Sequence, residues 1–137
     1  SFPGNYCFAK PNAAELGELF DEQPDGSETQ VQRLAKKMMG LGVERVLVST
    51  GSTGGMLIRD GVCLRARVPE LDVCSTIGSG DATVAGFCVA LNNGWEDTQA
   101  LRLAMACGVC NALFKEVGFV ERSKVDELVD RIQVERI

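Results

Sequence analysis

Apolar residues recur with two different periods along this chain of 137 residues. Apolar positions three and four apart predict helices over residues 13–20, 27–41, 82–91, 97–115 and 123–132. Short apolar runs between turn residues predict strands over residues 6–10, 44–50, 56–58 and 62–64, the last two as a hairpin. Strands that alternate with helices in this way indicate an α/β fold, with a parallel sheet covered by helices.

Polar residues at the predicted helix starts support these boundaries. Asn12 is placed to cap the first helix, and Ser27 and Gln30 have the spacing of a capping box at the second. Asp97 and Ser123 are the expected caps of the last two helices. A cap satisfies N–H groups that lack a partner within the helix, so each residue favours a helix beginning beside it.

A glycine-rich turn, Gly78–Asp81, lies between an extended segment and an apolar helix. Two closely spaced glycines expose backbone N–H groups, and the helix start adds partial positive charge, so the turn suits a phosphate. Asp81 would place a carboxylate beside that phosphate, as a base for an attacking hydroxyl requires. The alternative is an ordinary helix capped by Asp81. Thr83 replaces the third glycine of a dinucleotide fingerprint, and no Walker A lysine follows.

Two further loops carry chemistry suited to phosphate, and all three follow predicted strands. Ligands of open α/β sheets bind beyond the carboxyl ends of strands, so the three loops are expected to meet. Lys10 could neutralise a phosphate, and Asn12 and Glu15 share a helical face that could hold Mg²⁺ through its waters. Ser49–Gly55 offers hydroxyls and bare amides to a nucleotide. The alternative for Glu15 is a first-turn carboxylate that is favoured by the helix dipole. The alternative for Gly51–Gly55 is a flexible turn without a ligand.

Composition and charge exclude several classes of function. The net charge of −5 argues against a nucleic-acid partner, which calls for a basic face. No apolar run approaches the ~20 residues of a membrane span, and no signal peptide is recognised, so no membrane partner is expected. The absence of histidine excludes Ser-His-Asp and Cys-His catalysis within the chain. The length suits a single domain over residues 1–137.

The six cysteines are expected to be reduced. Cys88, Cys107 and Cys110 lie in helical patterns, where a thiol behaves as a small apolar side chain. Cys107 and Cys110 form a C-x-x-C without a second pair or a histidine, so neither a metal site nor a redox role is expected. Reduced cysteines favour a cytoplasmic location.

Three segments resemble the ribokinase-like (PfkB) carbohydrate kinases, namely residues 10–15 (KPNAAE), 48–55 (VSTGSTGG) and 75–81 (STIGSGD). Residues 104–112 (AMACGVCNA), with the later Gly118, resemble most the tagatose-6-phosphate kinase and 1-phosphofructokinase branch. The resemblance implies a ribokinase-like α/β sandwich of parallel sheet and covering helices. It also implies an ATP-dependent enzyme that phosphorylates a hydroxyl of a ketohexose phosphate, such as fructose 1-phosphate or tagatose 6-phosphate.

The resemblance implies a catalytic role for the glycine-rich turn. Asp81 would be the catalytic base, and the backbone amides of Gly78, Ser79 and Gly80 would form the anion hole for the transferred phosphoryl group. The family usually has alanine where Ser79 stands, and serine should be tolerated because the hole is built from backbone.

The resemblance also implies sites for nucleotide and cations. The residues that match nucleotide-binding positions are Lys10, Asn12, Ser49, Gly51, Ser52, Gly54 and Gly108. Asn12 and Glu15 match the Mg²⁺-linked N-x-x-E motif. The carbonyls of Ser75 and Ile77, with the region of Gly118, match a K⁺ site that some members have.

Members of the family are much longer, and this chain matches their C-terminal half. The N-terminal half and the lid, which carry most sugar contacts, are not in this sequence. We therefore expect the chain alone to be inactive, and its uncovered edge or face to promote dimers or larger homo-oligomers. Two alternatives stay open: a nucleotide-binding or regulatory module without turnover, and a kinase of another sugar or of a nucleoside.

Overall fold

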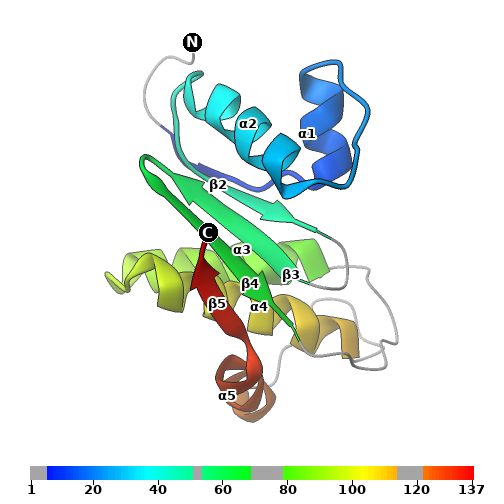
Figure 1. The fold of residues 1–137 in the computed structure, drawn as a ribbon. Helices are drawn as coiled ribbons and strands as arrows, with labels where there is room; N and C mark the ends of the chain where they lie inside the picture. The colour runs from blue at the N-terminus through cyan, green and yellow to red at the C-terminus, as the bar shows by residue number, and fades with distance from the viewer. Residues whose placement is uncertain (1–5, 51–53, 69–78, 114–121) are drawn as a thin grey trace. The chain divides into compact units, whose positions relative to one another are not determined.

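The structure is a computed structural model that describes residues 6–50, 54–68, 79–113 and 122–137 (Figure 1). The chain divides into two compact units. The first unit comprises Ser1–Gly51, Gly55–Arg65 and Arg136–Ile137, and the second comprises Ser52–Gly54 and Ala66–Glu135. Each unit is described by itself below.

The strands form a mixed five-stranded sheet in the order β1-β2-β3-β4-β5. Their bounds are β1 Tyr6–Ala9, β2 Val43–Ser49, β3 Gly54–Arg59, β4 Val62–Arg67 and β5 Gln133–Arg136. Strands β1 and β2 are parallel, as predicted, with Phe8 opposite Arg45. Strands β2 and β3 are antiparallel, with Leu47 opposite Leu57. The predicted α/β class is confirmed, and the hairpin between β3 and β4 turns at Gly61, whose φ is +73°.

Two helices cover one face of the first unit's strands, α1 (Ala13–Leu19) and α2 (Glu28–Met39) (Figure 1). The core between them is apolar and consists of Leu16, Val31, Leu34, Ala35, Val43, Val46, Val48, Met56, Ile58 and Cys63. In β2 the side chains of Val46 and Val48 belong to this core, while Leu47 between them is equally buried. A strand whose successive side chains are all buried has both faces covered, which explains its continuous apolar run.

The α1–α2 connection is held by one carboxylate, that of Glu22. Arg33 Nη1 donates to Glu22 Oε2 at 2.8 Å, and Gln30 Nε2 also donates to the carboxylate, at 3.4 Å. The hydrogen bonds from Arg33 lower the pKa of Glu22 to about 2. The Gln30 Oε1 atom, which would accept from the Ser27 N–H in a complete capping box, accepts from the Asp25 N–H at 3.0 Å, so the predicted box at α2 is only half formed. Ser27 Oγ accepts from the Gln30 N–H, but the Ser27 N–H donates to Asp25 Oδ1.

The second unit contains α3 (Ser79–Asn92), α4 (Asp97–Leu113) and α5 (Arg122–Arg131). Helices α3 and α4 lie side by side and carry apolar residues on most sides (Figure 1). Phe87 of α3 and Leu101 of α4 are fully buried. Gly86 brings the two helices together, since a β-carbon there would lie 2.9 Å from Cys107 Sγ and 3.2 Å from Ala104 Cα. Among the described helices, none has the length and apolar character of a membrane span.

Most predicted elements are confirmed, and the differences are a few helix and strand bounds and one strand that was not predicted. Helix α4 begins at Asp97 itself and α5 begins at Arg122, so Asp97 and Ser123 lie within the first turns of these helices. Strand β3 begins at Gly54, two residues earlier than predicted. Strand β5 was not predicted, because four residues beside a chain end give too short a pattern.

The α3–α4 contact predicts that Gly86→Ala destabilises the second unit. Alanine is better than glycine in a helix by ~1 kcal/mol, but overpacking a tight contact costs ~1–3 kcal/mol. We expect a net loss of about 1 kcal/mol in the free energy of unfolding, measured by urea denaturation. Adding Cys107→Ala should recover part of the loss, since it removes the sulfur. A Gly86→Ala protein more stable than the parent would contradict the tight contact.

Candidate active site

In the first unit, the carboxyl ends of β1 and β2 bring together two of the three predicted loops. Asn12 and Ser49 form a parallel bridge beyond the two strands, and the Ser49 N–H donates to the Pro11 carbonyl at 3.3 Å. Lys10 Nζ lies 3.5 Å from Ser49 Oγ. The loops that carry Lys10 and Ser49 therefore meet at this end of the sheet, as the sequence predicted for loops that follow parallel strands.

Asn12 and Glu15 form a reciprocal capping box at the start of α1. The Glu15 N–H donates to Asn12 Oδ1 at 2.7 Å, and the Asn12 N–H donates to Glu15 Oε1 at 2.9 Å. The predicted cap is confirmed, and it holds both side chains at the exposed end of α1. The box employs one oxygen of the carboxylate and one lone pair of the amide, so oxygen acceptors remain for a hard cation.

Lys10 supplies positive charge at the same end. Its side chain is half-buried, and its hydrogen-bond partner is the uncharged Ser49 hydroxyl. Within the described ranges, no carboxylate lies within ion-pair distance of its ammonium group. A lysine without a carboxylate partner keeps its charge available for an anion such as a phosphate.

In the second unit, Asp81 is exposed in the first turn of α3. The helix begins at Ser79, so Asp81 is its third residue and not its cap. A carboxylate in this turn is favoured by the helix dipole. Gly80 is half-buried, and its N–H belongs to the first turn, whose amides have no carbonyl partner within the helix. The turn can therefore present bare amides and a carboxylate to the same ligand.

Gly54 is constrained by its own strand pair. It is buried at the start of β3 with φ of +146°, and a β-carbon there would lie 2.0 Å from the Ala66 carbonyl oxygen in β4. Only glycine permits this approach of two backbones. The sequence had suggested a nucleotide contact at Gly54, and the structure adds a packing reason for glycine that the sequence did not reveal.

The remaining predicted residues are divided between a helix and segments outside the described residues. Gly108 is buried in α4. Gly51, Ser52 and Gly78 of the predicted site lie outside the described residues, as do the predicted cation ligands Ser75, Ile77 and the region of Gly118. The structure thus places Lys10, Asn12, Glu15 and Ser49 in one unit, and Gly54, Ser79, Gly80, Asp81 and Gly108 in the other.

The cysteine pair of α4 has the character of core residues. Cys110 is fully buried and Cys107 is half-buried, and both are free thiols. Burial, with a smaller contribution from Cys110, raises the pKa of Cys107 to about 11. Among the described residues, no three Asp, Glu, Cys or His side chains gather as a metal site would require.

Comparison with known proteins identifies relatives of both units. A family model described as pfkB family carbohydrate kinase matches residues 5–121. A provisionally assigned phosphofructokinase from Staphylococcus aureus superposes with a TM-score of 0.90 and 27% identity, over 97% of this chain and 42% of that protein. Ribokinase from Arabidopsis thaliana, complexed with ribose and ATP, gives a TM-score of 0.81 and 29% identity, over 90% of this chain and 40% of that one.

Phosphofructokinase-2 from Escherichia coli, in complex with potassium, shares the fold at a TM-score of 0.85 and 23% identity. That match covers 93% of this chain and 41% of the E. coli protein. The chain therefore spans about two fifths of the length of the solved structures that it matches. The predicted ribokinase-like fold is confirmed by these superpositions.

The close approach at Gly54 predicts that Gly54→Ala destabilises the fold, with or without bound nucleotide. Backbone strain and the clash with Ala66 should together cost ~3 kcal/mol or more in thermal or urea unfolding. Gly61→Ala is the matched control on the same hairpin, because Gly61 also has a positive φ but open space around it. It should cost only ~1–2 kcal/mol. Equal effects of the two substitutions would contradict the clash.

The thiols predict an order of alkylation by iodoacetamide. Only the thiolate reacts, and a thiol of pKa about 11 is ionised to roughly one part in a thousand at pH 8. Exposed Cys88 should be labelled first and Cys107 far more slowly, as followed by peptide mass spectrometry. Labelling of Cys107 should accelerate as the pH rises toward 11. Rapid labelling of Cys107 at pH 8 would indicate an activated thiol instead of a core residue.

Proposed function

The chain belongs to the pfkB family of carbohydrate kinases, and from this membership we propose that it carries the ATP-binding and catalytic part of a sugar-phosphate kinase. The proposed reaction moves the γ-phosphoryl group of ATP to a hydroxyl of a ketohexose phosphate, such as fructose 1-phosphate or tagatose 6-phosphate. The observation that carries the proposal is Asp81, an exposed carboxylate in the first turn of an apolar helix. Binding a nucleotide phosphate gains nothing from a carboxylate beside it, whereas phosphoryl transfer requires a base there.

In the proposed mechanism, Asp81 accepts the proton of the attacking sugar hydroxyl. The oxygen then forms a bond to the γ-phosphorus while the bond to the β-phosphate oxygen of ATP breaks, and ADP leaves. Backbone amides of Gly78, Ser79 and Gly80 stabilise the charge that spreads over the transferred group. The helix start of α3 contributes further positive potential.

The segments that match the family's nucleotide-binding positions supply the proposed nucleotide contacts. The Lys10 ammonium and the Ser49 hydroxyl, already 3.5 Å apart, would face the ATP phosphates. Gly51, Ser52 and Gly54 would extend this surface, and Gly108 would flank the adenine. We propose that Asn12 and Glu15 hold Mg²⁺ through its waters, because both offer oxygen atoms beyond those in the capping box. When bound, Mg²⁺ would neutralise charge on the phosphates.

Three further expectations belong to this proposal. A potassium ion would bind the Ser75 and Ile77 carbonyls near Gly118, and the E. coli phosphofructokinase-2 has been solved in complex with potassium. The same E. coli protein has been solved as a tetramer, which supports a homo-oligomer for the protein that contains this chain. A cytoplasmic location agrees with the four free thiols among the described residues.

A second candidate substrate is a pentose such as ribose, since the Arabidopsis ribokinase is 29% identical over the matched region. A panel of ketohexose phosphates, free hexoses, ribose and nucleosides, assayed by ATP consumption with the protein as its gene encodes it, would choose between them. ATP binding without consumption of any substrate would instead support a regulatory nucleotide-binding module.

The proposed base predicts that Asp81→Asn lowers kcat by ~10²–10⁴-fold in the protein as its gene encodes it. Affinity for ATP, measured by calorimetry, should stay the same or increase slightly, because a negative charge beside the γ-phosphate is removed. Asp126→Asn is the control, since Asp126 is an exposed carboxylate on α5. Normal turnover by Asp81→Asn would contradict the mechanism and would show that Asp81 only stabilises the start of its helix.

The anion hole predicts a different result for Gly80→Ala. An ordinary first helical turn accepts alanine and gains ~1 kcal/mol in stability. In an anion hole, the added methyl group would hold the phosphate away from its amide donors, at a cost on the order of 10²–10³-fold in kcat. We expect a folded protein with this loss, from thermal melting measured beside the kinase assay. A stable protein with full activity would show the turn to be structural only.

A further inference from the structure

Helix α4 carries one charged side chain beyond its first residue, that of Arg102. The neighbours of Arg102 along the helix are apolar, and Leu101 and Ala104 are fully buried. A guanidinium group remains protonated at any physiological pH and binds anions through several N–H donors. A lone cation within an apolar helix therefore requires a partner.

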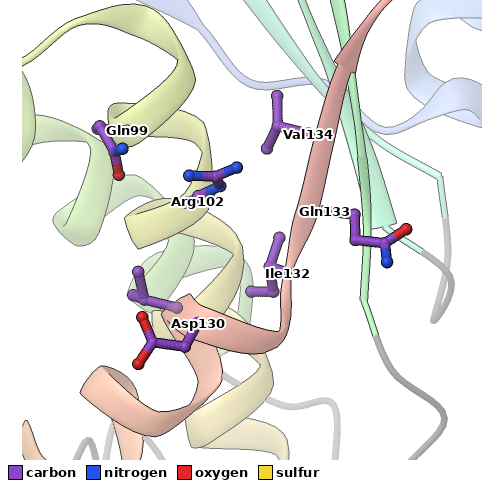
Figure 2. A pocket seen from close by; sticks show the side chains of 7 residues that line it. Gln99, Arg102, Asp130, Ile132, Gln133 and Val134 are labelled. Carbon is purple, nitrogen blue, oxygen red and sulfur yellow. The ribbon is translucent and has the colours of Figure 1, made fainter.

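Arg102 lines a pocket of about 420 Å³ in the second unit, between α4, the end of α5 and β5. The lining residues are Gln99, Arg102, Val129, Asp130, Ile132, Gln133 and Val134. Figure 2 shows the Arg102 side chain projecting from α4 toward β5. Gln99 precedes Arg102 by three residues, so both side chains are on the same face of α4.

The guanidinium group lacks a partner within the described part of the chain. Its Nε atom is buried and makes no hydrogen bond there. Asp130 lines the same pocket, but the two side chains form no ion pair, and Figure 2 shows the carboxylate directed away from the guanidinium group. A buried donor without an acceptor destabilises the fold, and more so when it is charged. An anion in the pocket would remove this cost.

We propose that this pocket binds a small oxyanion, held by the guanidinium group of Arg102 and assisted by the Gln99 carboxamide. Both carboxylate and phosphate accept the parallel N–H donors of arginine. Because Asp130 repels added negative charge, the site should prefer one charge to two, and hence a carboxylate to a phosphate dianion. The proposal does not depend on the kinase reaction, because none of its residues belongs to the proposed active site.

The test observes the NMR signal of the Arg102 Nε–H group in the protein as its gene encodes it, labelled with ¹⁵N-arginine. The signal is assigned by its loss in Arg102→Met. Sodium acetate and sodium phosphate are titrated against sodium chloride at matched ionic strength. We expect the signal to shift saturably with acetate, and more weakly with phosphate at pH 8. Arg131→Met should leave the response unchanged, because Arg131 is an exposed arginine on α5.

A second variant keeps the proposal testable if Arg102→Met does not fold. Asp130 is exposed, so Asp130→Asn should fold, and removing its charge should tighten acetate binding by about threefold. A response no larger than that to chloride would overturn the proposal, as would an affinity unchanged or weakened by Asp130→Asn. Phosphate bound at the proposed kinase site would leave the Arg102 signal unmoved, so failure of either proposal can be recognised separately.

Discussion

The parallel pairing of β1 with β2 is the constraint on which the first unit's chemistry depends. Parallel strands end at the same edge, so residues 39 positions apart, Lys10 and Ser49, come into hydrogen-bond contact. The pairing continues past the strands through the bridge between Asn12 and Ser49. This extension places the start of α1, with its capping box, beside the end of β2. A cation, a hydroxyl and two oxygen-bearing side chains are thereby presented at one end of the sheet.

The packing of α3 against α4 plays the corresponding part in the second unit. Asp81 is useful to a reaction only if its helix is held firmly, and α3 is held by one buried face that includes Ala82 and Ala90. Gly86 allows α4 to approach closely, and Phe87 beside it is fully buried. Close packing of this kind fixes the direction of a helix start, because interdigitated side chains leave little room for adjustment. The exposed first turn is thus supported by the buried face of the helix that follows it.

Several residues serve stability and chemistry at the same time. Asn12 and Glu15 satisfy the amides of a helix start with the atoms that also suit a hydrated cation. Gly54 lies in a segment that resembles a nucleotide-binding loop. The close Ala66 backbone by itself requires glycine there, because it leaves no room for a β-carbon. Asp81 is favoured by the helix dipole and is also placed to accept a proton. For such residues a loss of activity on mutation has meaning only beside a measurement of stability.

The sequence by itself determined the elements and the chemistry of the loops. Local signals were sufficient: the periods of apolar residues for the helices and strands, Asn12 for the start of α1, and the segments 10–15, 48–55 and 75–81 for the family resemblance. Tertiary structure decided what depends on distant partners. Strand β5 formed because β4 was there to pair with it, and Arg102 of α4 came to line a pocket with residues of α5 and β5. Each of these outcomes depends on groups far apart in the sequence that only folding brings into contact, so no local pattern could reveal them.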